Sequence, residues 1–149
     1  ICSGFPSVDI MSKTPVVCDN GTGFVKLGYA GQYFPEYIFA SMIGTPTMKY
    51  SEEFENVDLK KVVVGDEAQK YRHMLEVKYP VSEGRILYWS GDYSIHHIWD
   101  YAFNEKLEIG EQDRSDHNIL LTEAPNNPKS NKMRMLEAML ETYGWAGAT

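Results

Sequence analysis

The chain has 149 residues, of which 43% are hydrophobic and 23% charged, a composition that suits about one globular domain and excludes an intrinsically disordered protein. The formal net charge of -7 argues against nucleic acid or an anionic membrane surface as the main partner, because both attract clustered Lys and Arg. No apolar run approaches the ~20 residues that cross a bilayer, and Cys2 and Cys18 are too few for a disulfide framework. We therefore expect a cytoplasmic protein without membrane insertion.

Residues 1–14 are expected to form a disordered leader. Met11 opens the stretch MSKTPVV, which is typical of an initiation site with small polar residues before a first strand. Two interpretations of residues 1–10 stay open: they are sequence from upstream of the start, or they are part of the protein.

The first ordered part of the sequence predicts a β-hairpin. Residues 15–19 indicate a strand, 20–23 a turn and 24–30 a returning strand, because turn residues separate two apolar runs. Residues 34–43 predict a third strand. We expect it to end at the Gly-Thr-Pro of residues 44–46, since proline stops regular pairing.

The middle of the chain turns polar and acidic over residues 47–61 and indicates a small, mobile, mostly β excursion. A helix is predicted to start at Gly65 or Asp66 and to end near residue 75. Asp66 is expected to cap its free N–H groups, with Gln69 at the reciprocal position of a capping box.

The second half of the chain predicts two helices that flank a strand, and the whole order indicates an α/β (mixed α+β) fold. Ser94 is a good N-cap for the first helix, in which apolar residues recur at helical spacing. Residues 118–122 predict a strand buried on both faces in a parallel or mixed sheet. The last helix is expected to begin at Ser130 or Asn131 and to end at Gly144. Its core face is expected to carry Leu136, Met139, Leu140 and Tyr143.

The turn between the first two strands is a candidate phosphate site. Gly21 and Gly23 can take positive φ angles, which would point successive N–H groups into one anion-binding hollow, and Thr22 adds a hydroxyl. Lys26 can reach back toward a phosphate, and Asp19 can hold a divalent cation directly or through water. An ordinary hairpin turn with both charges solvated explains the same residues, so the spacing leaves both interpretations open.

Some other conspicuous residues are better explained by structure than by chemistry. His96 and His97 are adjacent on a predicted helix and point about 100° apart, so we expect surface residues and no shared metal. Met133, Met135 and Met139 are expected to fill gaps in the core.

Separated stretches of the sequence resemble the N-terminal third of the actin family, in the family's order and close to its intervals. The resemblance covers residues 16–143 and rests on VCDNGTGFVKLGYAG, FPEYIF, VGDEAQ, MLEVKYPV, IWDYAFNEKL and ILLTEAPNNPKSN. The variants GTGFVK, YFPEYIF and MLEVKYP resemble an actin-related protein more closely than conventional actin.

The resemblance implies part of an actin-like ATPase fold, the two-lobed architecture that actin shares with Hsp70 and the sugar kinases. Residues 15–43 and 70–149 would be an incomplete first subdomain, and residues 44–69 the small second subdomain. Together they would make most of the first lobe.

By the same resemblance, the family's first phosphate loop falls on the hairpin turn. Lys26 matches the lysine that contacts phosphate, and Asp19 matches the aspartate that reaches Mg²⁺ through water. No catalytic residue is expected in this chain, because the family's second phosphate loop and its water-positioning glutamine would lie beyond Thr149. The implied ATP-binding residues are Asp19, Asn20, Gly21, Thr22, Gly23, Phe24 and Lys26.

The resemblance implies an ATP-binding subunit of the complex that nucleates branched actin filaments. The whole protein would be a slow ATPase, and the present chain alone would be inactive. Its partners would be actin, actin-related protein 3 and the accessory subunits of that complex, and its location the cytoskeleton. Three alternatives stay open at this point. One is a conventional actin or another actin-related protein, another is a metabolic phosphotransferase of the same superfold, and the third is a truncated product that acts only as a binding fragment.

Overall fold

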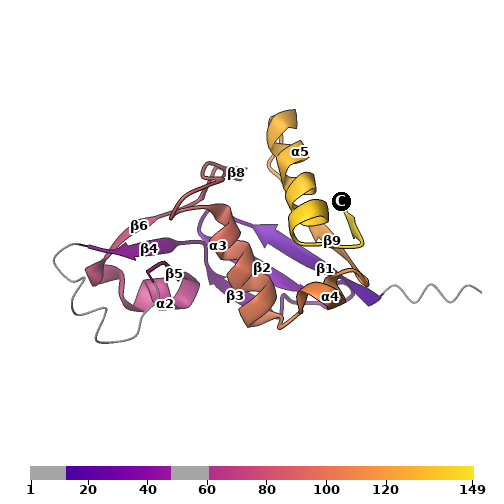
Figure 1. Ribbon diagram of the computed structural model, residues 1–149, viewed down its shortest axis with the longest axis horizontal. Coiled ribbons are helices and arrows are strands. Elements are labelled where there is room, and N and C mark those ends of the chain that lie inside the picture. Colours follow the sequence, from indigo (N-terminus) through magenta and orange to yellow (C-terminus); the bar gives the residue numbers. More distant parts are fainter. Residues whose placement is uncertain (1–12, 48–60) are drawn as a thin grey trace, which may run out of the picture.

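The computed structural model describes residues 13–47 and 61–149, and its largest unit is a five-stranded mixed sheet of order β10-β9-β1-β2-β3 (Figure 1). The central strand β1 lies antiparallel to β2 and parallel to β9, which in turn lies parallel to β10. The predicted mixed α/β fold is therefore confirmed. The strands are β1 (Lys13–Asn20), β2 (Phe24–Tyr29), β3 (Tyr37–Ala40), β9 (His117–Leu121) and β10 (Gly147–Ala148).

Parts of two expectations lie outside the described residues. These are residues 1–12 of the expected leader and residues 48–60 of the expected acidic excursion. The last two residues of the expected leader, Lys13 and Thr14, are the first two of β1, so the prediction of disorder is wrong for them. The division into two subdomains stays a prediction.

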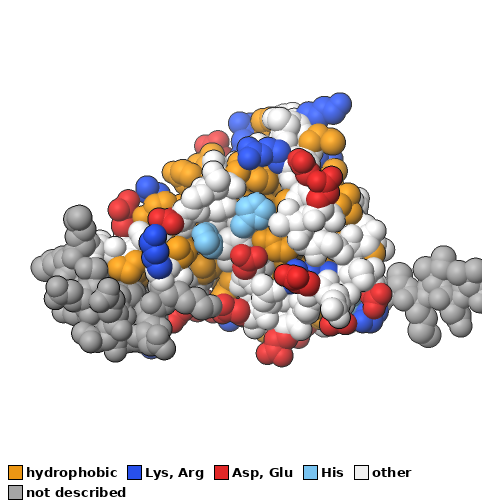
Figure 2. Space-filling model, viewed as in Figure 1, with side chains coloured by type: hydrophobic (Ala, Val, Ile, Leu, Met, Phe, Trp, Pro, Cys, Tyr) orange, Lys and Arg blue, Asp and Glu red, His pale blue; other side chains and the backbone are white. Residues whose placement is uncertain are grey.

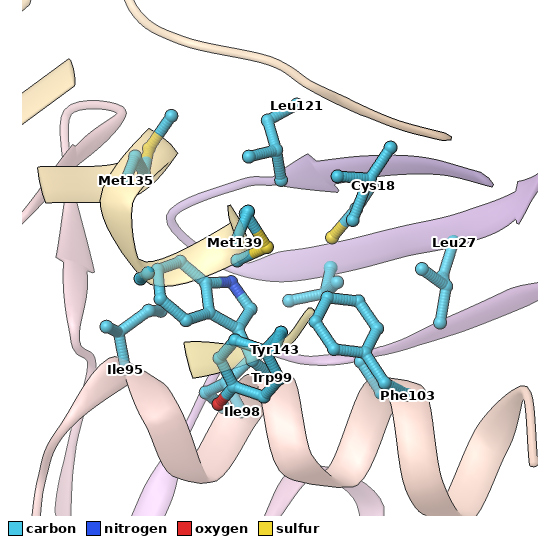
Figure 3. Close-up of a cluster of buried hydrophobic side chains, with 14 of the residues drawn as sticks. Cys18, Leu27, Ile95, Ile98, Trp99, Phe103, Leu121, Met135, Met139 and Tyr143 are labelled. Atoms are coloured by element: carbon cyan, nitrogen blue, oxygen red, sulfur yellow. The ribbon is translucent and has the colours of Figure 1, made fainter. Parts of the chain in front are cut away.

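The main core lies between one face of this sheet and two helices. α3 (Ile95–Asp100) continues into the wider π-helical turn η3 (Tyr101–Lys106), and α5 (Lys129–Glu137) continues into η4 (Ala138–Thr142). Figure 3 shows side chains from both helices pointing toward those of the strands. The residues that meet there include Cys18, Leu27, Ile98, Trp99, Phe103, Leu121, Met139 and Tyr143.

The prediction for α3 is confirmed. The Ser94 hydroxyl accepts a hydrogen bond from the His96 N–H at 3.3 Å, so it caps the helix as expected. The residues of the predicted apolar stripe are all fully buried: Ile95, Ile98, Trp99 and Ala102.

The expectation that residues 118–122 are buried on both faces is wrong. Along β9, buried residues alternate with exposed ones, and Leu120 is 42% exposed. The reason is tertiary: among the described residues, the helices cover only one face of the sheet. The expected parallel pairing is nevertheless present on both sides of β9.

The single strand predicted over residues 34–43 is also wrong, because the chain changes sheets within it. β3 ends at Ala40, and β4 (Ile43–Pro46) belongs to a separate three-stranded sheet with β5 (Val63–Val64) and β6 (Leu75–Lys78). Pro46 does not stop pairing but forms the last pair of β4, opposite Leu75. Figure 1 shows this smaller sheet at the end of the molecule away from α5.

The helix beside the smaller sheet starts close to the predicted place but without the predicted cap. α2 (Gly65–Lys70) has Val64 at its N-cap position with no side-chain hydrogen bond, and a short turn, η2 (Arg72–Met74), follows it. Asp66 lies inside the first turn and pairs with Lys106 at 3.2 Å. The capping box is therefore absent, because the helix begins two residues too early for Asp66 to be its N-cap.

The core face of the last helix is rotated from the predicted one. Met139 and Tyr143 are buried as expected, but Leu140 is 45% exposed, and Met135 and Ala138 take the remaining core positions. Met133 is 55% exposed, so only two of the three methionines fill the core. Gly144 has a φ of +71°, which confirms it as the residue that ends the helix.

His96 is not the simple surface residue that we expected. Its ring stacks on Tyr143 with centroids 5.9 Å apart, and Tyr143 donates a hydrogen bond to Asp100 at 3.0 Å. Burial lowers the pKa of His96, and burial with the nearby Asp100 raises the pKa of Tyr143. Both side chains therefore stay neutral at pH 7 and join α3 to η4.

The remaining elements are short and lie at the rim. β7 (Val81–Ser82) and β8 (Arg85–Ile86) form a small hairpin, and α4 (Glu111–Arg114) precedes β9.

Figure 2 shows basic side chains near the tip of α5 and acidic and basic side chains interspersed elsewhere on that face. Within the described residues, no helix is long and apolar enough to cross a bilayer.

Candidate functional site

The candidate site lies where β1 and β2 meet at their turn. Asp19 and Lys26 face each other directly across the two antiparallel strands. The Lys26 ammonium donates to Asp19 Oδ2 at 3.2 Å, and both side chains lie on the sheet face that the helices leave open. The structure therefore brings together the charged pair that the spacing singled out.

Thr122 is a third member of this group, and the sequence analysis missed it. Its hydroxyl donates to Asp19 Oδ1 at 2.5 Å, while its backbone N–H bonds to the Cys18 carbonyl at 3.3 Å. Thr122 follows β9 directly, and β9 pairs in parallel with β1. The parallel pairing predicted for residues 118–122 was the available signal, but it did not identify β1 as the neighbour.

Asn20 points the opposite way from Asp19, into the core. Trp99 Nε1 donates to Asn20 Oδ1 at 3.1 Å, and the Cys18 thiol lies 3.6 Å from the same oxygen. Burial, with a smaller effect from the charge of Asp19, raises the pKa of the Cys18 thiol to about 12, so the thiol stays protonated. The Asn20 side chain therefore anchors the end of β1 to α3.

The backbone of the turn differs from the anion-binding hollow expected from its glycines. Neither Gly21 nor Gly23 has a positive φ, and the Gly21 N–H is used within the turn, bonded to the Asp19 carbonyl at 3.1 Å. Gly21 is required for another reason, since a Cβ there would lie 2.4 Å from the carbonyl oxygen of Phe24. Close backbone approach explains this glycine.

Residues 22–24 of the turn are exposed, and two of them form hydrogen bonds to other parts of the chain. The Thr22 hydroxyl accepts a hydrogen bond from the Gly84 N–H at 3.4 Å and keeps its own proton to donate, and the Gly23 carbonyl accepts from the Ser41 N–H at 2.9 Å. A Cβ on Gly23 would meet nothing within 4 Å, so the fold does not require a glycine there. Phe24 is 55% exposed.

The turn carries an exposed cation at Lys26, an exposed hydroxyl at Thr22 and backbone N–H groups that could bond to an anion. Among the described residues, the N–H groups of Thr22 and Gly23 form no backbone hydrogen bond. Within the same residues, no group of three or more His, Cys, Asp or Glu side chains could hold a metal ion directly. Asp19, a single carboxylate, suits a bond to a water on Mg²⁺ better than direct coordination.

Comparison with known proteins identifies similar chains. The family model for actin matches residues 10–149. The chain is 46% identical over 137 residues to "Actin-related protein 2" of Acanthamoeba castellanii and to that of Schizosaccharomyces pombe, with 92% of this chain and 34% of each relative covered. It is 42% identical over 136 residues to the protein of the same name from Arabidopsis thaliana, with 91% of this chain and 33% of the relative covered. The chain thus spans about a third of the length of these relatives.

The first prediction concerns the anchor between Asn20 and Trp99. Replacing Trp99 by Phe removes the indole N–H and part of a fully buried ring, which leaves a small cavity and a buried amide oxygen with only the weak thiol donor. We expect the free energy of unfolding to fall by about 1–3 kcal/mol in urea denaturation.

Trp89→Phe is the matched control. Trp89 is half-buried and lies under the Arg134 guanidinium at 4.6 Å, a contact that a Phe ring can keep in part. We expect a loss below about 1 kcal/mol. Equal losses in the two variants would show that the Asn20 anchor contributes nothing measurable.

Proposed function

The chain belongs to the actin family, and we propose that its β1–β2 turn binds the β- and γ-phosphates of ATP as one side of a nucleotide site. Asp19, Asn20, Gly21, Thr22, Gly23, Phe24 and Lys26 are the proposed residues of that side. The actin-like fold of the chain is partial, consistent with its coverage of about a third of the relatives.

The observation that supports this proposal best is the unexplained glycine at position 23. Its backbone does not need a glycine, and the space where a Cβ would lie is empty. A missing side chain that the fold does not require is expected where a ligand approaches the backbone closely. The free N–H groups of Thr22 and Gly23 would then bond to phosphate oxygens, with Lys26 as the charged partner.

The remaining residues of the turn have supporting roles in this proposal. Asn20 holds the end of β1 through Trp99, and Gly21 lets the turn close against Phe24. Asp19 would accept a hydrogen bond from a water on the Mg²⁺ that accompanies ATP and neutralises phosphate charge. No catalytic residue is proposed within this chain.

We propose further that the whole protein acts as an ATP-binding actin-related subunit in a complex that nucleates branched actin filaments. The relatives' name, actin-related protein 2, supports this assignment over conventional actin. Actin, actin-related protein 3 and accessory subunits would be its partners, in the cytoplasm and cytoskeleton. ATP would hold the two lobes together, and slow hydrolysis would time the state of the complex.

A second prediction tests the phosphate site with Lys26→Ala in a full-length protein, meaning a chain of the relatives' length that carries this segment. Loss of a charge-assisted contact should weaken ATP binding by about 10- to 150-fold, equivalent to about 1.5–3 kcal/mol, in isothermal titration calorimetry. Gly23→Ala should also weaken binding while leaving thermal stability unchanged, because the fold has room for the methyl group.

Lys129→Ala serves as the control, since Lys129 is an exposed lysine at the start of α5. We expect its ATP affinity to equal that of the unmodified protein. Unchanged ATP affinity in both Lys26→Ala and Gly23→Ala would contradict the proposed phosphate site and favour an ordinary hairpin turn with solvated charges.

A third prediction tests the assembly. Actin-related protein 3 should co-purify with the tagged full-length protein and not with conventional actin tagged in the same way. Its absence from the full-length pull-down would exclude the proposed complex and favour a conventional actin or another actin-related protein.

A further inference from the structure

We propose that Thr122 is a positioning residue that holds the Asp19 carboxylate in place when Lys26 turns to the nucleotide. This inference rests on the proposed function of the turn as a phosphate site. It assigns a role to a residue outside the turn, which directly follows β9 and lies more than ninety positions further along the chain.

The three side chains form one row across three neighbouring strands. Asp19 is in the middle on β1, Lys26 lies opposite on β2, and Thr122 follows β9 on the other side of β1. Lys26 bonds to one carboxylate oxygen at 3.2 Å and Thr122 to the other at 2.5 Å. Asp19 is therefore held from both sides.

The two bonds differ in how easily they are given up. The Lys26 and Asp19 side chains are 54% and 35% exposed, and ion pairs in such surroundings contribute little free energy. A phosphate that binds at the turn would draw Lys26 away from Asp19 at small cost. Among residues 13–47 and 61–149, the hydrogen bond from Thr122 would then be the remaining side-chain contact of the carboxylate.

The position of Thr122 is itself fixed by the backbone. Its N–H bonds to the Cys18 carbonyl at 3.3 Å, which extends the parallel ladder between β9 and β1 by one residue. The hydroxyl is thus placed by the sheet, not by a mobile loop. A hydroxyl fixed in this way would keep Asp19 oriented toward a water on Mg²⁺, as outer contacts of metal sites commonly do.

The fold gives little other reason for a hydroxyl at this position. Thr122 is exposed, so its side chain fills no core space, and valine would keep its shape and β-branching. Thr122→Val therefore removes the hydrogen bond with little change in packing, and Thr122→Ser keeps the bond.

The experiment measures ATP affinity of the full-length protein by calorimetry, once with Mg²⁺ and once with EDTA. Thr122→Val should weaken binding about tenfold or more with Mg²⁺ and leave it unchanged in EDTA, because Asp19 acts only through the metal-bound water. Thr122→Ser should restore the affinity. Thr142→Val, the same change at an exposed threonine in η4, should have no effect.

The possible results separate this inference from the proposed function. If the unmodified protein binds no ATP, the proposed function fails and the role of Thr122 fails with it. If the unmodified protein binds ATP and Thr122→Val binds equally well with Mg²⁺, only the role of Thr122 is wrong. Equal weakening with Mg²⁺ and in EDTA, or no rescue by serine, would also overturn it, because the effect would not pass through the metal.

Discussion

The pairing of β1 with a strand on each side is the constraint on which the rest of this structure depends. Because β1 is central, its side chains must alternate between a face buried under α3 and η4 and a face that those helices do not cover. The side chains of the neighbouring residues Asp19 and Asn20 consequently lie on opposite faces of the sheet and make different contacts. Asn20 anchors the strand end to Trp99, while Asp19 meets Lys26 and Thr122 on the open face.

The features that could be predicted from the sequence are those that local physical chemistry determines. The hairpin follows from turn residues between apolar runs, and α3 follows from the cap at Ser94 and the helical spacing after it. The change of sheet after Ala40 carries no such local signal, since the same apolar run suits one long strand. The exposed face of β9 and the contact of Thr122 with Asp19 depend on which elements pack together, and spacing alone does not contain that information.

At the candidate site, too, the sequence predicted some features correctly and others wrongly. Spacing placed Asp19 and Lys26 together correctly, because a short antiparallel turn leaves few alternatives. It gave the wrong reason for the glycines: Gly21 is needed for close contact with Phe24, and Gly23 is not needed by the fold at all. The family resemblance supplied what spacing could not, a reason for an open position at Gly23. The proposed phosphate site therefore rests on the geometry of the turn together with membership of the actin family.

The most direct test of the central claim is a crystal structure of the full-length protein with ATP and Mg²⁺. The account predicts phosphate oxygens within about 2.7–3.2 Å of the Gly23 N–H and of Lys26 Nζ. It also predicts that Lys26 no longer bonds to Asp19, while the bond between Asp19 and Thr122 remains. Phosphates bound away from the turn, with the Lys26–Asp19 pair intact, would contradict it.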